Sequence, residues 1–567
     1  MKRRGKLLRP KPWGWKETLS LVLLLVLGGV LFFTAIGHRS LWERDEARYA
    51  EVAREMAVSG DWVTPRLNQV KYFSKPPLTY WLAALCFKLG GVSEASARVV
   101  PALFGVLTLV VTFLLGRSLG DLRSGLWAAI VLATSGLFFV MSRLVMGDML
   151  LCFGVTLALY GAWELRQARD WGGYVFWAGV SIGFLAKGLL GLGLPAMVAV
   201  IFACLGGEWS LIKRIVHWRG LALFALLSLP WVIWVGSVNP EFFGSFFIDE
   251  NLGRLFSGGG KSSPAFFYYL WLLPLAFVPW VALLPWSLAQ QWPGRGWRSP
   301  EQRHWLWLVV WTASFLIFFT LSASKSAHYA LPILPGLALM MGRPMASLWE
   351  GRGSGRGLRP VGLSLLVLSL AILLGALVIY LAPSLGLGLS YNRLGMLLLL
   401  GPAVLAGLGL AIAVTRNWAW SGLAAPLALF VVLALSLGLA ADRLDERFSI
   451  KKLALTAKNH MKKQDLLVCY KDFYSGAAFY SGKRVAVVAN WGDLDFGRRR
   501  DQDSRTWFIA DSKAFLKRLQ NPRQRVIGLS KIKDFGELKK RASGLPGLLL
   551  FEWARAGDHV LFSNRPR

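Results

Sequence analysis

Long apolar runs separated by short polar segments dominate the first 440 residues of the chain. Many runs reach about 18 residues, which is enough for a helix to cross the hydrocarbon core of a bilayer. The alternating pattern of a membrane β-barrel is not seen. The sequence therefore predicts a polytopic α-helical membrane protein with about thirteen spans, at residues 18–36, 97–116, 124–141, 149–165, 172–186, 188–205, 220–236, 265–288, 304–321, 329–345, 360–382, 395–414 and 421–440.

The charge of the polar segments predicts the topology. Seven Lys and Arg residues precede the first span, and basic segments of this kind are retained in the cytoplasm. No small-residue cleavage site follows, so we expect the first span to stay in place as an anchor. Every second loop is basic, whereas each outer loop after the first carries only one or two basic residues. An odd number of spans then places the C-terminus on the outer face.

The first outer loop, residues 37–96, is longer than any other outer loop. Its segment "KPPLTYWLAALCFKLGG" (75–91) is short and apolar, begins with a proline pair and contains Lys88. We interpret it as an interfacial helix, since counting it as a span would invert the charge pattern of the later loops. Long loops between helices are often functional. A second, flexible outer loop is expected at 237–264.

The composition changes near residue 440 and predicts a second domain. Residues 442–567 hold 27 Lys and Arg against 14 Asp and Glu. Short apolar runs such as "DLLVCY" and "QRVIGLS" alternate there with helix-like segments such as "DFGELKKRA". We therefore expect a membrane domain at 1–440 and a small soluble α/β domain at 441–567, on the outer, periplasmic side.

The overall charge is strongly basic, but it does not indicate nucleic-acid binding. The chain has 567 residues, a net charge of +32 and a mean hydropathy of +0.47. In a membrane protein, Lys and Arg of this number are explained by cytoplasmic retention and anionic lipid headgroups. The four cysteines show no spacing typical of disulfides or zinc sites. "SGGGKSS" (257–263) lacks the strand and the first glycine of a phosphate loop.

The most charged part of the first outer loop is "ERDEARYAEVAREM" (43–56). On a helix, Asp45, Arg48 and Tyr49 share one face, because they are three and four positions apart. Glu51, Arg54 and Glu55 are expected on a solvated, salt-bridged side. The stretch suits either a surface helix or a reactive site. Aromatic and basic residues farther along the loop also suit a lipid phosphate headgroup or a simple interfacial anchor.

Further charged residues lie at span ends on the predicted outer face. Asp148 begins one span, and either caps that helix or joins Asp45 in an acid–base or metal site. Lys187, Arg254 and Lys325 lie at other span ends on this face. Such cations either reach toward headgroups or form a cluster for an anionic, phosphate-bearing lipid.

Several motifs in this chain resemble those of the protein O-mannosyltransferase-like, GT-C glycosyltransferase superfamily, and above all its bacterial 4-amino-4-deoxy-L-arabinose transferases. The resemblance is carried by "ERDEARYAEVAREM", "GDWVTPRLN", "YFSKPPLTYWL", "ARVVPALFGVLT", "SRLVMGDMLL", "LAKGLLGLGLP", "FFIDENLGR" and "HYALPILPGLAL". It implies an integral inner-membrane enzyme that moves a sugar from a polyprenyl-phosphate carrier to an envelope acceptor at the periplasmic face, with inversion. In the aminoarabinose enzymes that acceptor is a lipid A phosphate.

The resemblance also implies roles for individual residues. The family pattern makes Asp45 and Asp148 the catalytic acids. The substrate-binding residues that it implies are Arg48, Tyr49, Lys75, Lys187, Arg254, Lys325 and His328.

This chain departs from the family pattern at a pair of positions that could hold a divalent ion. Relatives often have Glu before the "KPP" segment and His in the loop after "NLGR", whereas here Ser74 precedes Lys75 and residues 255–265 contain no His. If Lys261 takes the place of that His, its ammonium replaces the charge of the metal. We therefore expect no tightly held metal and no cofactor.

Other functions remain open at this stage. The acceptor could be a protein, as in O-mannosyl transfer, or another envelope glycan. A transporter of lipid-linked sugars is disfavoured, because it predicts mid-bilayer charges and internal repeats, and most spans here have uncharged interiors. A receptor or scaffold with a binding ectodomain would not explain the charged first loop. We expect a monomer that contacts membrane lipids and no nucleic acid.

Overall fold

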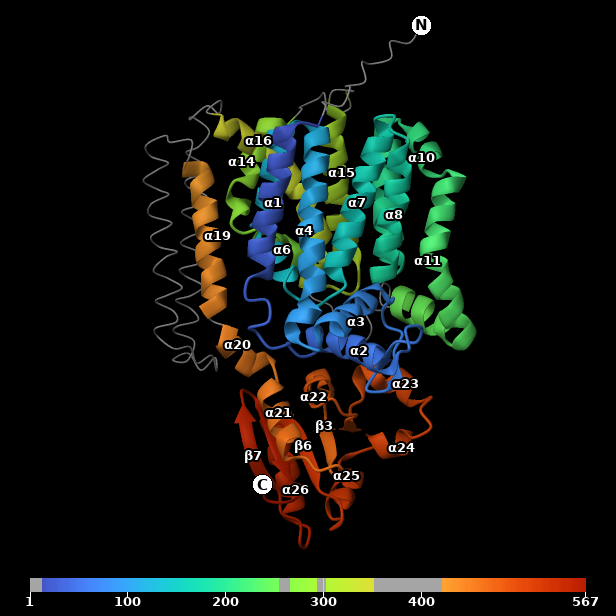
Figure 1. Ribbon diagram of the computed structural model, residues 1–567, viewed down its shortest axis with the longest axis vertical. Helices are drawn as coiled ribbons and strands as arrows, with labels where there is room; N and C mark the ends of the chain where they lie inside the picture. Colours follow the sequence, from blue (N-terminus) through green and yellow to red (C-terminus); the bar gives the residue numbers. More distant parts are fainter. Residues whose placement is uncertain (1–12, 254–265, 293–298, 300–301, 351–420, 440) are drawn as a thin grey trace.

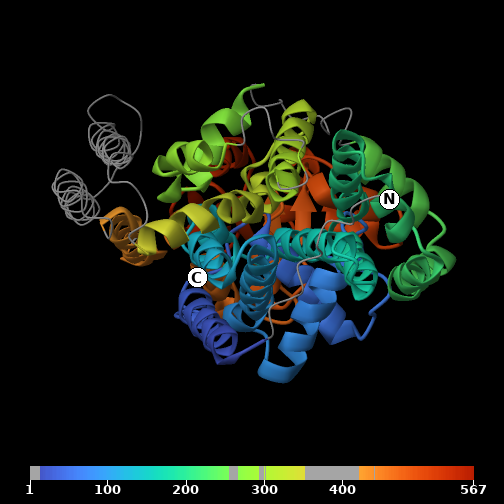
Figure 2. The same ribbon diagram turned by 90° about the horizontal axis from the view of Figure 1, so that it is seen from above.

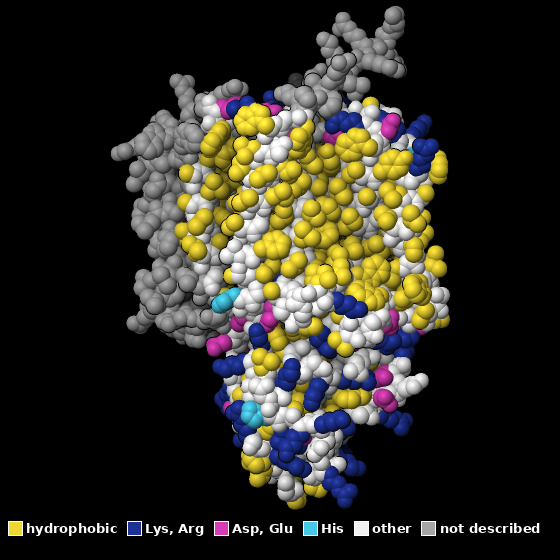
Figure 3. All heavy atoms as spheres, viewed as in Figure 1, with side chains coloured by type: hydrophobic (Ala, Val, Ile, Leu, Met, Phe, Trp, Pro, Cys, Tyr) yellow, Lys and Arg dark blue, Asp and Glu magenta, His cyan; other side chains and the backbone are white. Residues whose placement is uncertain are grey.

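The protein was analysed as a computed structural model, which describes residues 13–253, 266–292, 299, 302–350, 421–439 and 441–567. In Figure 1 the molecule has three layers. A bundle of long helices forms the upper part, a thin layer of crosswise helices lies beneath it, and an α/β domain forms the lower part. Viewed from above, the bundle helices are seen nearly end-on (Figure 2). The wide apolar band of Figure 3 covers the bundle, and Lys and Arg are numerous on the lower domain.

Seven helical segments among the described residues are long and apolar enough to cross a membrane. Shorter helices complete the bundle, and each predicted span within the described residues coincides with helical structure. Two predicted spans, 360–382 and 395–414, lie outside those residues, so the number thirteen stays a prediction. The bundle helices are α1 (Trp15–Phe33), α4 (Glu94–Leu119), α5 (Leu122–Ala133), α6 (Gly136–Met141), α7 (Asp148–Arg166), α8 (Trp171–Lys187), α9 (Leu189–Gly206), α10 (Trp209–Ile215), α11 (Trp218–Val238), α13 (Tyr268–Ala276), α14 (Leu284–Gln291), α15 (Arg303–Leu321), α16 (Leu334–Trp349) and α19 (Ser421–Leu439).

Two predicted spans are not continuous helices. The span at 124–141 breaks between α5 and α6, and the span at 265–288 breaks between α13 and α14, where the short 3₁₀ helix η3 (Trp280–Ala282) intervenes. The breaks face each other: Gly136 N–H donates to the Val278 carbonyl at 2.8 Å, and the Trp280 indole donates to the Thr134 hydroxyl at 2.9 Å. Backbone groups freed inside a membrane need such internal partners.

The middle layer is built from the first loop after α1. It contains α2 (Glu46–Ser59), the strand pair β1 (Arg66–Leu67) and β2 (Val70–Lys71), and α3 (Leu78–Gly90). At 13 residues α3 is too short to cross a bilayer. Figure 1 shows α2 and α3 lying across the end of the bundle, between the bundle and the lower domain. This is the placement that an interfacial helix requires.

The expectation of a solvated side on α2 is wrong. Glu51 is 0% exposed and Glu55 8% exposed. Arg54 pairs with Glu51 at 2.6 Å, and the backbone N–H of Gln69 donates to Glu55 at 2.9 Å. Burial raises the pKa of both carboxyl groups. A dense run of charges predicts a wet surface only if no other segment covers it, and here Gln69 of the β1–β2 turn contacts Glu55, which lies beside Glu51.

Glu46 anchors the start of α2 to the bundle. Its carboxylate accepts two hydrogen bonds from the buried guanidinium of Arg98, at 2.7 and 2.9 Å, and pairs with Arg39 at 3.4 Å. The backbone N–H of Trp42 donates to the same carboxylate at 3.0 Å. A buried carboxylate needs this many partners to offset its lost hydration. The contacts fix the position and direction of α2 relative to α4.

The lower domain is a six-stranded sheet flanked by helices, with strand order β5-β4-β3-β6-β8-β7. Strands β5, β4, β3 and β6 are parallel, and β8 and β7 add an antiparallel edge. Its elements are α20 (Ala441–Phe448), α21 (Lys451–His460), β3 (Leu466–Tyr470), α22 (Ser475–Ser481), β4 (Ala486–Val488), η8 (Gly492–Leu494), α23 (Asp495–Arg498), α24 (Ser504–Trp507), β5 (Phe508–Ile509), α25 (Ser512–Leu519), β6 (Val526–Lys531), α26 (Ile532–Ala542), β7 (Phe551–Ala556) and β8 (His559–Ser563).

The crevice of this sheet is filled by the protein itself. In the sheet, β4 and β5 lie on one side of β3, whereas β6 lies on its other side. The strand order therefore reverses between β3 and β6. Doubly wound folds bind ligands at the carboxyl ends of the strands at such a switch point. Glu43, in the loop that follows α1, enters near the carboxyl end of β3. The Gly476 N–H in the first turn of α22 donates to its carboxylate at 3.1 Å, and the Glu43 N–H donates to the Phe448 carbonyl at 2.8 Å. Glu43 therefore fastens the domain to the middle layer.

The Glu43 contact predicts a pH-dependent stability. Burial raises the pKa of the Glu43 carboxyl to about 8, whereas an unfolded Glu titrates near about 4.3. The folded state thus holds this proton more tightly, so the stabilisation is complete below the unfolded pKa and is lost as the pH rises toward 8. The loss is at most about 1.4 kcal/mol per pH unit.

Glu43→Gln is expected to flatten the fall in Tm between about pH 4 and pH 8 in thermal unfolding of detergent-solubilised protein. Equal slopes for both proteins would contradict it.

Candidate active site

Two antiparallel helices bring the first pair of charged residues together. Helices α7 and α8 pack so closely that a Cβ at Gly179 would lie 2.5 Å from the Gly154 carbonyl oxygen. Asp148 begins α7 and Lys187 ends α8, so the two side chains meet at the same end of the bundle. The Lys187 ammonium donates to Asp148 Oδ1 at 2.9 Å, and both side chains are buried. Asp148 Oδ2 has no hydrogen-bond partner among the described residues, so it can accept a bond from a substrate.

The segment before α16 supplies the next group of residues. It is the 3₁₀ helix η6 (Ala327–Ile333), and it carries His328 and Tyr329. His328 Nε2 lies 3.9 Å from Asp148 Oδ1, and Lys187 Nζ lies 5.8 Å from the centre of the Tyr329 ring. Lys325 precedes η6, and its ammonium donates to the Ser322 carbonyl at 3.0 Å.

The start of α2 forms the opposite wall. Asp45 is the N-cap position of α2, and Arg48 Nη2 donates to its Oδ1 at 2.5 Å. Tyr49 is buried with its ring 5.4 Å from that of Tyr80. Burial raises the pKa of Tyr49 to about 12, with opposing effects from Lys187 and Asp148. Tyr49 therefore stays protonated and can donate a hydrogen bond.

Lys75 approaches the cluster from the loop between β2 and α3. Its ammonium donates to the Ser74 carbonyl at 2.8 Å and lies 3.7 Å from a Glu250 carboxylate oxygen. Glu250 belongs to η1 (Gly244–Gly253), a π-helical segment. The Ser74 hydroxyl also donates to Glu250, at 2.9 Å. Ser74 thus helps to hold the Glu250 carboxylate beside the Lys75 ammonium.

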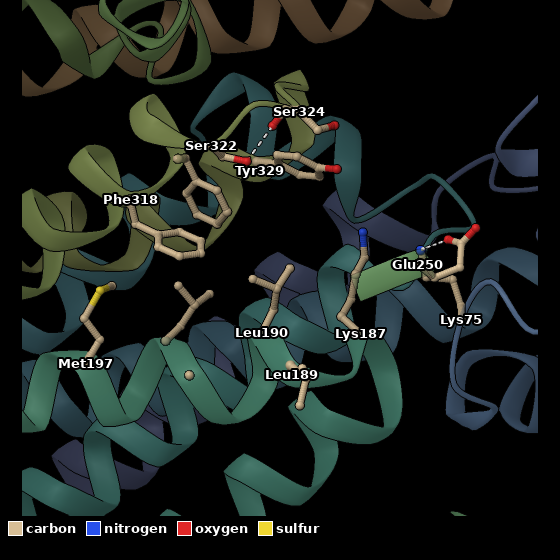
Figure 4. Close-up of a pocket in the computed structure, with 13 residues that line it drawn as sticks. Lys75, Lys187, Leu189, Leu190, Met197, Glu250, Phe318, Ser322, Ser324 and Tyr329 are labelled. Atoms are coloured by element: carbon tan, nitrogen blue, oxygen red, sulfur yellow. Dashed lines mark hydrogen bonds and ion pairs between the residues drawn. The ribbon is translucent and has the colours of Figure 1, made fainter. Parts of the chain in front are cut away.

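A cavity of about 280 Å³ opens between these elements. Lys75, Lys187 and Glu250 lie at one end of it. The remainder is largely apolar and is lined by α9 and by the end of α15, through residues that include Leu190, Met197 and Phe318 (Figure 4). One end of the cavity can therefore hold an anion, and the other can hold hydrocarbon.

The residues proposed from the sequence converge for the most part. Asp45, Arg48, Tyr49, Lys75, Asp148, Lys187 and His328 come from five segments and lie close enough to influence one another electrostatically. Arg254 lies outside the described residues. Glu250 and Tyr329 were not singled out, although both lie inside quoted motifs, "FFIDENLGR" and "HYALPILPGLAL". Their positions inside these family motifs were the signal that could have indicated Glu250 and Tyr329 as site residues.

The residues around Lys75 do not fit a divalent-ion site. Within the described ranges, no group of three His, Cys, Asp or Glu side chains is placed to hold a metal ion. The Glu250 carboxylate faces the Lys75 ammonium and accepts a hydrogen bond from the Ser74 hydroxyl. In these contacts neither partner acts as a metal ligand.

The fold and the site define a multi-pass membrane protein with a buried acid–base cluster at one end of its bundle. Residues 18–243 match the family described as dolichyl-phosphate-mannose-protein mannosyltransferase. An undecaprenyl phosphate-α-4-amino-4-deoxy-L-arabinose arabinosyl transferase of Pseudomonas aeruginosa PAO1 is 32% identical over 366 residues, 62% of this chain and 65% of the relative. The enzyme of the same name from Edwardsiella ictaluri is 30% identical over 384 residues, 65% of this chain and 66% of that enzyme. The matches thus span slightly less than two thirds of these relatives.

Solved structures extend the similarity over nearly the whole chain. ArnT from Cupriavidus metallidurans, crystallised bound to undecaprenyl phosphate, superposes with a TM-score of 0.79 and 25% identity, over 97% of this chain and 98% of that one. An oligosaccharyltransferase of Archaeoglobus fulgidus shares the fold, with a TM-score of 0.53 and 13% identity, over 97% of this chain and 74% of that one. This chain is thus similar to the dolichyl-phosphate-mannose-protein mannosyltransferase family over residues 18–243, resembles the aminoarabinose transferases over nearly two thirds of their length, and shares the fold of ArnT.

Proposed function

We propose that the protein is an integral membrane glycosyltransferase that moves 4-amino-4-deoxy-L-arabinose from a polyprenyl-phosphate carrier to a lipid A phosphate. The observation that carries the proposal is the cavity between α9, α15 and Lys75, which has two lysine ammonium groups and the Glu250 carboxylate at one end and is largely apolar along the rest. A lipid phosphate has the same division, with an anionic head and a hydrocarbon chain. The Cupriavidus metallidurans structure, which contains undecaprenyl phosphate, supports this choice of carrier.

The donor phosphate fits beside Lys75 and Lys187. Each ammonium already faces a carboxylate, Glu250 at 3.7 Å and Asp148 at 2.9 Å. Lysine ammonium groups carry three donors and can bind a phosphate oxygen while keeping one carboxylate contact. The apolar wall from Leu190 to Phe318 receives the first part of the carrier chain. Burying that chain contributes roughly 25 cal/mol per Å² of apolar surface.

The chemistry follows from the leaving group. The bond between the anomeric carbon and the carrier phosphate oxygen breaks, and the phosphate leaves as an anion without needing a proton. Fixed positive charge at Lys75 and Lys187 stabilises the charge that develops on it. The acceptor oxygen forms the new bond from the opposite face, so a single displacement inverts the anomeric carbon.

The role of Asp45 depends on the acceptor. A phosphate acceptor is already anionic and requires no base, so Asp45 then orients it or stabilises the positive charge that develops on the sugar. A hydroxyl acceptor would transfer its proton to Asp45. Arg48 faces Asp45 and provides a cation for an anionic acceptor.

The proposed topology places the reaction outside the cytoplasm. The basic N-terminal segment is cytoplasmic and the α/β domain is periplasmic, in the inner membrane of a bacterium. The cluster at the domain-facing end of the bundle then faces the periplasm, where nucleotide-sugars are scarce and a lipid-linked donor is needed. We propose that the protein acts as a monomer on lipid substrates.

Mass spectrometry of lipid A and of envelope proteins tests this function. Cells that express the protein are expected to gain a mass corresponding to aminoarabinose on lipid A, and cells with Asp45→Asn are expected to lack it. A sugar-sized shift on envelope proteins alone would support protein O-glycosylation instead, which the match to the mannosyltransferase family favours as the second candidate. No shift in either fraction would refute both.

A further inference from the structure

One side chain of the site is held from the α/β domain. Arg48 donates through Nη2 to Asp45 and through Nη1 to Asp493 Oδ2. Asp493 lies in η8, 445 positions along the chain from Arg48. The guanidinium of Arg48 is planar and its donors have fixed directions. Two carboxylates on two of its nitrogens therefore fix the plane of the group as well as its position.

The segment around Asp493 is itself fastened to the site. The ring of Phe496 packs edge-on against Phe73, with centroids 5.7 Å apart. Gly497 approaches the strand β2 so closely that a Cβ would lie 2.5 Å from the Lys71 carbonyl oxygen. Phe73 and Lys71 lie in the stretch that leads to Lys75. The same segment thus supports both the loop that carries Lys75 and the side chain of Arg48.

The Arg48 bridge is too exposed to be a major source of folding stability. The side chain of Asp45 is 50% exposed, that of Asp493 41%, and that of Arg48 19%. Ion pairs with partners this exposed contribute little to stability, because water and salt screen them. The Arg48 bridge instead orients the side chains that it joins. Asp493 occupies Nη1, so Arg48 cannot offer both terminal nitrogens to Asp45, and the contact to Asp45 runs from Nη2 to Oδ1. Asp45 Oδ2 is then left for the acceptor.

We propose that Asp493 is a positioning residue for sugar transfer: it holds the Arg48 guanidinium so that Asp45 is oriented but not masked. The proposal rests on the proposed function, since Asp45 and Arg48 act on the acceptor in that reaction. It gives the α/β domain a role in the reaction centre. The centre is complete only when this domain is docked on the middle layer.

Steady-state transfer in proteoliposomes tests the proposal with full-length protein. Asp493→Asn is expected to lower kcat about 10- to 100-fold with an unchanged KM for the lipid-linked donor, because the donor lysines are untouched. Asp493→Glu, which keeps the carboxylate, is expected to restore part of kcat. Arg500→Ala is the matched control: Arg500 reaches Glu241 at 4.0 Å from the same segment, and its loss is expected to leave kcat unchanged.

A double-mutant cycle separates positioning from a general loss of docking. In an Arg48→Ala background, Asp493→Asn is expected to cause no further loss, because its effect passes through Arg48. An unchanged kcat in Asp493→Asn, or an additive loss in the double variant, would overturn the proposal. Electron cryo-microscopy of Asp493→Asn in nanodiscs gives a readout without activity. Arg48 is expected to turn onto Asp45 alone, and an unmoved Arg48 would refute the idea even if the sugar or acceptor were misassigned.

Discussion

Replacing Asp45 with Asn is expected to lower the rate of sugar transfer by about 10²- to 10⁴-fold and to leave the protein folded. The carboxylate is half exposed, and among the described residues its ion pair is with Arg48, so the amide costs little stability. What is lost is the negative charge that orients the acceptor or takes its proton. The measurement is single-turnover transfer from a polyprenyl-phosphate sugar to lipid A in proteoliposomes.

The control for this experiment is Asp170→Asn. Asp170 immediately precedes α8, at the opposite end of that helix from Lys187, and pairs with Arg214 there. Its loss changes the same formal charge far from the cluster, and the rate is expected to be unchanged. Binding of undecaprenyl phosphate to Asp45→Asn should also be unchanged. Full transfer by Asp45→Asn would show that this carboxylate is not part of the reaction.

Lys187→Met is expected to destabilise the protein and to weaken donor binding about 10- to 100-fold. The substitution leaves the buried Asp148 carboxylate without its nearest cation, and breaking a buried pair in this way costs about 3–5 kcal/mol. It also removes a charged contact to the donor phosphate, which is worth about 1.5–3 kcal/mol. Thermal unfolding and equilibrium binding of undecaprenyl phosphate in nanodiscs measure the two losses.

The double variant Lys187→Met with Asp148→Asn separates these effects. It removes the orphaned charge, so stability should return toward that of the wild type. Binding should not return, because the phosphate still lacks its cation. Recovery of both quantities would mean that Lys187 serves only to neutralise Asp148.

The residues of the cluster could be anticipated from the sequence because their positions follow from span ends and loop charge. Asp148 and Lys187 lie at the ends of two successive spans, so alternation alone puts them on the same face of the membrane. Their 2.9 Å contact needed the close packing of α7 on α8. Asp45 was indicated by its helical spacing to Arg48 and Tyr49, and its role, like that of Lys75, was indicated by family motifs.

Features that depend on packing between distant segments could not be anticipated. Hydropathy reports apolar composition, so it could not show that the spans at 124–141 and 265–288 are broken. The charges of Glu51 and Glu55 suggested solvent, and only the packed fold around α2 reveals that both are buried. Asp493 lies in a domain whose docking no local pattern encodes.

The buried contact between Glu43 and Gly476 links positions 433 residues apart in the chain. A Cβ at position 476 would lie 2.1 Å from the Glu43 carboxylate oxygen, so any side chain there requires that carboxylate to move. A substitution at position 476 is therefore tolerated only if residue 43 gives way. A chimaera that takes its α/β domain from a relative with a larger residue at position 476 would carry this clash.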